Sequence, residues 1–440
     1  MTETEHQQYE PWATPNPPYN ADDPAERRST FKHDEDEIVY SKAFRRLSGK
    51  SQIVVKPESE DHFRSRLTHT LEVNEIARSI GQQLGLCTPL INAISLGHDL
   101  GHTPFGHAGE QEFQKIYRNE ILRLCDMDSF RRNFDSCYEN AFHYVNGDND
   151  IKNYCLFHHA VNSVSLIERK DLQVSDLVKL GIRTHSWAPW QSRTKFGIPL
   201  TYEAQAVAIA DQIASINHDT EDILTCPEAE HSIGKFHEEI PGFLRDKHDI
   251  EYKVAKDILE GWFLPSDTSG RKNSFSRKKR LQKIINSVAD STKDRFTQKN
   301  VSNWEDSRDP QKSLCIDNEM GKFLMGYEQY IRRIIREVSW FGIRDAVAAA
   351  VVRTVYNFFR HYGKAEGLRP GKIKDIIDEY QKSLGDDKWA VDKHFAVFLG
   401  SASRDKEEEV EESCKALAYV SGMTDARIMG LHFIAFEVFK

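Results

Sequence analysis

The sequence lacks the features that mark secreted or membrane-spanning proteins. Its seven cysteines form no C-x-x-C pair and are odd in number, which predicts reduced core residues rather than a disulfide framework. The N-terminus has no apolar stretch of the kind that signal peptides carry. No run of apolar residues approaches the length of a bilayer span. We therefore expect a cytoplasmic protein without membrane contact.

Strand signals are also scarce, and acidic residues outnumber basic ones. The net charge of -9 does not indicate a dedicated nucleic-acid binder. Gln52 to Val55 is the best short strand candidate, whereas the rest of the chain has mainly helical periodicity. We therefore expect an all-α protein.

Three stretches have apolar residues at the spacings of three and four that amphipathic helices show. One runs from Arg66 to Leu84, a second opens at Thr88-Pro89, and a third runs from about Tyr202 to Ile223. Residues 320–362 and about 406–440 are also expected to be helical.

Each of these three stripes carries a possible metal ligand where a hydrophobic residue is expected. The residues are His69, the pair His98-Asp99, and Asp211. A buried carboxylate needs a partner, and one divalent cation would supply it for all four side chains. Imidazole and carboxylate together suit Mn, Fe, Co, Ni or Zn, and also Mg if water completes the shell. The plainer alternative is a set of hydrogen-bonded core histidines and capping or salt-bridged aspartates.

The motifs around these residues resemble those of a known family. They are Arg66-Leu-Thr-His69, the stretch HDLGHTPFGHAGE from His98 to Glu110, and Ala210-Asp211-Gln-Ile. Together they resemble the HD superfamily and, more narrowly, its dGTP triphosphohydrolase family. Residues 40–47, 49–52 and 422–425 are also similar to that family, so the matching motifs are spread from about residue 34 to 430.

The resemblance implies an HD-domain helical core and a hydrolytic reaction. The expected reaction converts a deoxynucleoside triphosphate, with dGTP as the first guess, to a deoxynucleoside and inorganic triphosphate. The resemblance implies that His69, His98, Asp99 and Asp211 hold a divalent metal ion, which is Mn, Mg or another first-row metal.

The same resemblance implies that three catalytic residues lie beside the metal. His102 or His107 would protonate the leaving 5′ oxygen, because histidine titrates near neutrality. Glu110 would orient that histidine, since a carboxylate fixes an imidazole tautomer.

Four further residues are expected to contact substrate. Arg66 resembles the family's phosphate-binding arginine, and His159, which follows His158, resembles a histidine near the phosphates. Gln52 and Asp219 resemble contacts to the sugar. Ser215 departs from the tyrosine that the family commonly has there, which puts base preference and sugar selection in doubt.

We expect three regions along the chain. Residues 1–33 should form an extended N-terminal arm, residues 34–225 the HD phosphohydrolase core, and residues 226–440 a helical region packed on that core. A basic loop at about 266–299, with its charge concentrated in 271–283, could bind an activating dNTP or single-stranded nucleic acid, or be a solvated surface loop. The resemblance also implies a homo-oligomer, and a hexamer is the expected assembly.

Two other functions stay open at this point. One is another HD phosphohydrolase, a nucleotidase or phosphodiesterase, which would release single phosphates or open cyclic nucleotides. The other is a non-catalytic nucleotide or nucleic-acid sensor that keeps the metal site, which would bind dNTP or DNA without turnover.

Overall fold

The computed structural model describes residues 9–19, 27–51, 65–138, 157–191, 197–225, 230–262, 270–337, 339–365, 371–384, 401–403 and 405–438. Within these ranges the regular structure is helical, and the only β pairing is in isolated bridges. The expected all-α class is therefore confirmed. The strand predicted from Gln52 to Val55 lies outside the described residues. None of the described helices combines the length and the apolar composition that a membrane span requires.

The chain forms two compact units, and each unit draws on several stretches of sequence. The first unit contains residues 1–32, 71–95 and 184–342, and the second contains residues 33–70, 96–183 and 343–440. Five of the described helices have residues in both units: α1 (Thr30–Tyr40), α3 (Arg66–Leu84), α4 (Thr88–Gly97), α9 (Asp176–Thr184) and α15 (Ser339–Tyr362). The predicted division of the chain at residues 33 and 225 stays a prediction.

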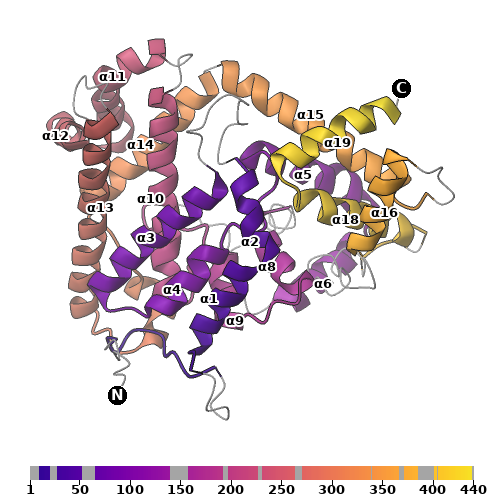
Figure 1. The fold of residues 1–440 in the computed structure, drawn as a ribbon. Helices are drawn as coiled ribbons and strands as arrows, with labels where there is room; N and C mark the ends of the chain where they lie inside the picture. The colour runs from indigo at the N-terminus through magenta and orange to yellow at the C-terminus, as the bar shows by residue number, and fades with distance from the viewer. Residues whose placement is uncertain are drawn as a thin grey trace. The chain divides into compact units, whose positions relative to one another are not determined.

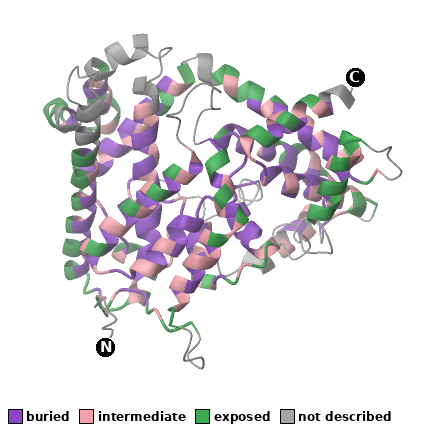
Figure 2. Cartoon of the chain, in the orientation of Figure 1, coloured by how far each residue is buried: buried purple, intermediate pink, exposed green. Residues whose placement is uncertain are grey.

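The first unit is built mainly from long helices, which Figure 1 labels along the chain. They are α10 (Tyr202–Thr225), α11 (Glu230–His248), α12 (Tyr252–Trp262), α13 (Gly270–Gln298) and α14 (Asn318–Glu337), with short 3-10 turns η5 (Trp304–Arg308) and η6 (Pro310–Lys312) before α14. Helix α11 packs against α12 and α14, α12 packs against α13, and α10 packs against α14. Figure 2 shows that α10 is buried along most of its length, in agreement with its alanine- and isoleucine-rich sequence.

The prediction of a basic loop at about 266–299 was wrong for residues 270–298, because they form helix α13. The polar composition of this stretch hid an apolar stripe. Ile284, Ile285, Val288 and Phe296 recur at helical spacing and are buried. Arg280, which the sequence places in the basic run, is also buried, and its guanidinium contacts Asn217 and Glu221 on α10. Arg280 therefore belongs to the packing of this unit and not to a solvated basic patch.

The N-terminal segment binds helices of its own unit. The indole of Trp12 donates a hydrogen bond to the carbonyl of Leu84 at the end of α3 (2.9 Å). The backbone N–H and the hydroxyl of Thr14 both donate to the buried carboxylate of Glu203 on α10 (3.0 and 2.7 Å). The described part of the predicted arm is thus anchored to its own chain.

The second unit contains shorter helices from both halves of the sequence. They are α1 (Thr30–Tyr40), α2 (Lys42–Arg46), α5 (Gly106–Ile116), α6 (Met127–Tyr138), α8 (His159–Arg169), α9 (Asp176–Thr184), α16 (Lys372–Leu384), α18 (Glu407–Ser421) and α19 (Asp425–Val438), together with 3-10 turns η1 (Leu47–Gly49) and η3 (Leu122–Leu124) and a π-helical turn η2 (Tyr117–Ile121). The predicted helical segment at 406–440 is two helices, α18 and α19, which Gly422 to Thr424 separate.

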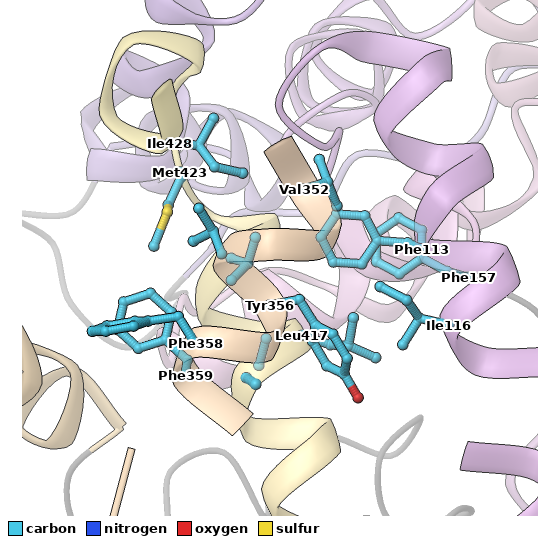
Figure 3. Close-up of a cluster of buried hydrophobic side chains, with 14 of the residues drawn as sticks. Phe113, Ile116, Phe157, Val352, Tyr356, Phe358, Phe359, Leu417, Met423 and Ile428 are labelled. Carbon is cyan, nitrogen blue, oxygen red and sulfur yellow. The ribbon is translucent and has the colours of Figure 1, made fainter. Parts of the chain in front are cut away.

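A single hydrophobic cluster joins these distant stretches. Figure 3 shows Phe113 and Phe157 beside Val352 and Tyr356 of α15, with Leu417 of α18 on the same cluster. The aromatic rings of Phe113 and Phe157 stack with their centroids 4.9 Å apart. Burial of such side chains is the main source of folding free energy, so α5, α15 and α18 stabilise one another.

Candidate functional site

Helix α3 places Arg66 and His69 one turn apart on the same side of the helix. The first backbone N–H of the helix, at Arg66, donates to the carbonyl of Lys50 (2.9 Å). The guanidinium of Arg66 donates from Nε to the carbonyl of Ser51 (3.2 Å) and from Nη1 to Asp99 Oδ2 (2.9 Å). The segment at 50–51 therefore fixes both the start of α3 and the direction of the arginine.

Asp99 Oδ2 is the atom on which three basic side chains converge. Besides Arg66, His98 Nε2 lies 3.6 Å and His69 Nε2 lies 3.9 Å from this oxygen. All of these side chains are buried. The structure thus brings together three of the four predicted metal ligands, and one ligand atom from each lies within 4.8 Å of the others.

The electrostatics of this cluster favour an ionised Asp99. Burial alone would raise the pKa of Asp99, but the adjacent His98 and the guanidinium of Arg66 hold that pKa well below its usual range. A deprotonated carboxylate between two imidazoles is a suitable arrangement for a divalent transition metal.

The turn from Gly97 to His102 presents His98 and Asp99, and helix α8 holds this turn closely. The hydroxyl of Ser163 accepts a hydrogen bond from the Gly101 N–H (2.9 Å), and it lies 2.8 Å from the carbonyl of His98. The amide of Asn162 donates to the carbonyl of Gly101 (2.6 Å). A Cβ atom at Gly101 would lie only 2.1 Å from the Ser163 nitrogen and 2.3 Å from the Asn162 carbonyl carbon.

We expect Gly101→Ala to destabilise the protein because the turn must move away from α8. Forced repacking of this kind costs about 1–3 kcal/mol, measurable as a lower midpoint in urea denaturation. Gly430→Ala is the matched control, since a Cβ there meets no atom within 4 Å and Gly430 is an exposed helical position. The control should stabilise by about 0.5–1 kcal/mol through helix propensity. Equal stability of Gly101→Ala and the wild type would contradict the close contact.

A second cluster of imidazoles follows directly in the chain. Glu110 on α5 connects two of them: its Oε2 lies 3.3 Å from His107 Nδ1, and its Oε1 lies 3.1 Å from His159 Nδ1. Glu110 Oε1 also accepts the backbone N–H of His159 at the start of α8 (3.0 Å). His102 stacks on His159 with ring centroids 4.5 Å apart. The three predicted catalytic residues and His159 therefore lie together.

The members of this second cluster differ in charge and exposure. Burial would raise the pKa of Glu110, but His159 and His158 hold it well below its usual range, so the carboxylate is ionised. Burial, followed by the charge of Arg66, lowers the pKa of His102 well below its usual range, which keeps its ring neutral. Both ring nitrogens of His102 are buried without a hydrogen-bond partner among the described residues. His107 differs, because 61% of its side chain is exposed.

Residues near the C-terminal helices α18 and α19 support this site, although their signal in the sequence is weak. Asp425, at the start of α19, accepts the Phe105 N–H at Oδ1 (2.9 Å) and the Ser51 N–H at Oδ2 (2.9 Å). The ammonium of Lys50 is buried and donates to the carbonyls of His102 and Ser421. Burial lowers the pKa of Lys50 to about 7. The motif at 422–425 was the available signal, but no position within it indicated a partner 320 or more residues away.

The remaining predicted residues lie elsewhere. Asp211, the fourth predicted ligand, and Asp219 lie on α10 in the first unit, so their approach to the cluster stays a prediction. Ser215 lies on the same helix. Gln52 lies outside the described residues. Of the adjacent pair, His159 contacts Glu110, whereas His158 caps α8 by accepting the Ala160 N–H at its Nδ1.

Comparison with known proteins bears on the same stretch of chain. Residues 66–216 match the family model of the HD domain. The chain is 39% identical over 202 residues to a protein of Caldanaerobacter subterraneus subsp. tengcongensis, covering 45% of this chain and 46% of that protein. It is 29% identical over 364 residues to a protein of Rickettsia conorii, covering 81% of this chain and 85% of that protein. Both are named deoxyguanosinetriphosphate triphosphohydrolase-like protein.

The extent of these matches differs between relatives. The chain spans about half the length of the first relatives that it matches, including a similarly named protein of Nitrobacter hamburgensis that is 36% identical over 211 residues and covered to 48%. The range that matches the HD-domain model includes His69, His98 and Asp99.

Proposed function

We propose, from the HD domain that residues 66–216 form, that this protein is a metal-dependent hydrolase of deoxynucleoside triphosphates. The broader assignment, an HD phosphohydrolase, rests on the family match and on the names of the relatives. The proposed products are the deoxynucleoside and inorganic triphosphate, with dGTP as the first substrate to test. The observation that carries the proposal is the position of Glu110 and its imidazoles directly after the His69–His98–Asp99 cluster.

The donor set fits a divalent metal ion. Two ligands of one ion can lie at most about 4 Å apart, because metal–nitrogen and metal–oxygen bonds are about 2.0–2.2 Å long. The distances of 3.6 and 3.9 Å from the imidazole nitrogens to Asp99 Oδ2 satisfy this limit. His69, His98 and Asp99 would hold the ion, with Asp211 as the fourth ligand that the resemblance implies. A bound ion would polarise a phosphate and acidify a water molecule.

The side chains around the cluster are suited to a phosphate chain. Arg66 is a buried guanidinium, and a guanidinium has forked N–H donors that match phosphate oxygens. His102 is neutral and its buried ring nitrogens have no partner among the described residues, so one N–H can donate to a phosphate oxygen. Arg66 and His102 would orient the α-phosphate and would offset the negative charge on its oxygens as water attacks the phosphorus.

His107 is the proposed proton donor to the leaving 5′ oxygen. Its exposed ring leaves Nε2 accessible, while Nδ1 is directed at Glu110. The ionised Glu110 stabilises the protonated imidazole before transfer and fixes the tautomer afterwards. Of the two histidines considered as proton donor, His102 and His107, we favour His107, because Glu110 contacts His107 and His159 rather than His102.

Product analysis tests the proposal directly. The protein is incubated with each dNTP and each NTP in the presence of Mn²⁺ or Mg²⁺, and the products are separated by ion-exchange chromatography. The expected result is a nucleoside and inorganic triphosphate in equal amounts, with no diphosphate intermediate. Stepwise release of single phosphates, or no turnover with any nucleotide and either metal, would overturn the proposal.

A further inference from the structure

Asp425, the first residue of α19, lies beside the start of α5, although 320 positions separate it from Phe105 in the sequence (Figure 1). Both of its carboxylate oxygens accept hydrogen bonds from outside α19. Oδ1 accepts the Phe105 N–H (2.9 Å), and Oδ2 accepts the Ser51 N–H (2.9 Å) and the Ser51 hydroxyl. All three residues belong to the second unit. One side chain of the C-terminal helix therefore binds two segments of the candidate site.

The simplest alternative role for Asp425 is to stabilise its own helix, since acidic residues are favoured in the first turn of a helix. The preceding residue already caps α19, because Thr424 Oγ1 accepts the Arg427 N–H (3.4 Å). The carboxylate of Asp425 is instead directed at Phe105 and Ser51. Its contacts therefore serve other parts of the unit.

Phe105 has an unfavourable backbone conformation that needs support. Its φ of 62° lies in the left-handed region, which a bulky residue rarely adopts. It is also the N-cap of α5, yet its side chain cannot accept a hydrogen bond from that helix. The ring is buried and the N–H is bonded to Asp425, so side chain and backbone together hold the residue in this conformation.

The start of α5 determines the position of the proposed proton donor. His107 is the second residue of α5, and Glu110, whose Oε2 lies 3.3 Å from His107 Nδ1, follows one turn later. At the other end of the turn the ammonium of Lys50 donates to the carbonyl of His102. Release of Phe105 would move His107 relative to a bound phosphate chain, and a displacement of about 1 Å can cost about 10²-fold in rate.

The phosphate-binding arginine has supports that do not involve Asp425. Arg66 Nη1 donates to Asp99 Oδ2 (2.9 Å), and the Arg66 N–H donates to the carbonyl of Lys50 (2.9 Å). Loss of the Asp425 carboxylate should therefore release the start of α5 and leave Arg66 in place.

We propose that Asp425 is a positioning residue for the proposed reaction, which holds Phe105 in its left-handed conformation and thereby fixes His107 as the proton donor. The inference rests on the proposed function, since it assigns Asp425 a role in that reaction. It places a determinant of the rate outside the range 66–216 that matches the HD domain.

Asp425→Ala should lower kcat for dGTP by about 10–10²-fold, and KM should change little because Arg66 keeps its partners. The loss should be much smaller for an aryl triphosphate, since a phenolate leaves without a proton from His107. Asp425→Asn should retain more of the rate than Asp425→Ala, because its amide oxygen can still accept the Phe105 N–H while its amide nitrogen donates to the Ser51 hydroxyl. A wild-type kcat in Asp425→Ala, or an equal loss for the two substrates, would overturn the inference.

Hydrogen exchange measured by mass spectrometry tests the same contact without turnover. Peptides that cover residues 103–110 should exchange about tenfold faster or more in Asp425→Ala, since a lost hydrogen bond frees the turn to open. Asp375→Ala is the matched control, because Asp375 is an exposed carboxylate in the first turn of α16 in the same unit. It should keep the exchange and the rates of the wild type.

The two measurements also separate this inference from the proposed function. A wild-type protein that turns over no nucleotide, with the expected exchange difference intact, would reject the proposed function and with it the role of Asp425 in that reaction. An active wild type with unchanged exchange in Asp425→Ala would overturn the role of Asp425 alone.

Discussion

Asp99→Asn is expected to reduce kcat by about 10³-fold or more. A bound metal is worth several kcal/mol of transition-state stabilisation, and each 1.4 kcal/mol is tenfold in rate. The substitution keeps the size of the side chain and a carbonyl oxygen for Arg66 Nη1, but it removes the charge toward which His69 and His98 point. Metal affinity should fall with the rate, and calorimetric titration of Mn²⁺ measures it independently of turnover.

Asp290→Asn provides the control for this experiment, since Asp290 is an exposed carboxylate on α13. It should retain wild-type turnover and metal affinity. Far-UV circular dichroism of the Asp99 variant should keep its helical signal, which shows that lost activity is not lost fold. Full turnover by Asp99→Asn would reject the proposed metal centre.

His107→Ala is expected to lower kcat by about 10²–10³-fold, within the range typical of general acid catalysis. The fold should be unaffected, because the side chain is 61% exposed. The loss should shrink strongly for an aryl triphosphate, since a phenolate with a low pKa leaves without a proton. Steady-state rates for dGTP and for the aryl substrate, compared in the same variant, measure this difference.

His361→Ala is the matched control, since His361 is an exposed imidazole on α15 of the same unit. Both substrates should react with it at wild-type rates. An equal loss for dGTP and the aryl triphosphate in His107→Ala would show that His107 has no part in protonating the leaving group.

The sequence predicted those features that depend on short-range periodicity. Helix α3 begins at Arg66 and ends at Leu84 as its apolar stripe indicates, and α10 begins at Tyr202 as expected. His69 and His98 are buried on the faces where the stripes place them. Local spacing determines these results, because a helix with one apolar face has one stable orientation against a core.

The sequence failed where long-range packing decides the outcome. Residues 270–298 were predicted as a loop because their charged residues are more numerous than the apolar residues that helix α13 buries. The contacts of Lys50 and Asp425 join residues 371 and 374 positions apart, and no periodicity reports such a pair. The two-unit arrangement, in which each unit takes several stretches of the chain, is likewise set by packing and not by local pattern.

The contacts of Ser421 with Lys50 and of Asp425 with Phe105 have a consequence for biosynthesis. Translation proceeds from the N-terminus, so the ribosome completes the histidine-rich segment long before these two anchors exist. Lys50 and Phe105 therefore lack these contacts until residues 421 and 425 have been made. The segment that carries the proposed metal cluster would then gain this support only after α18 and α19 have been synthesised.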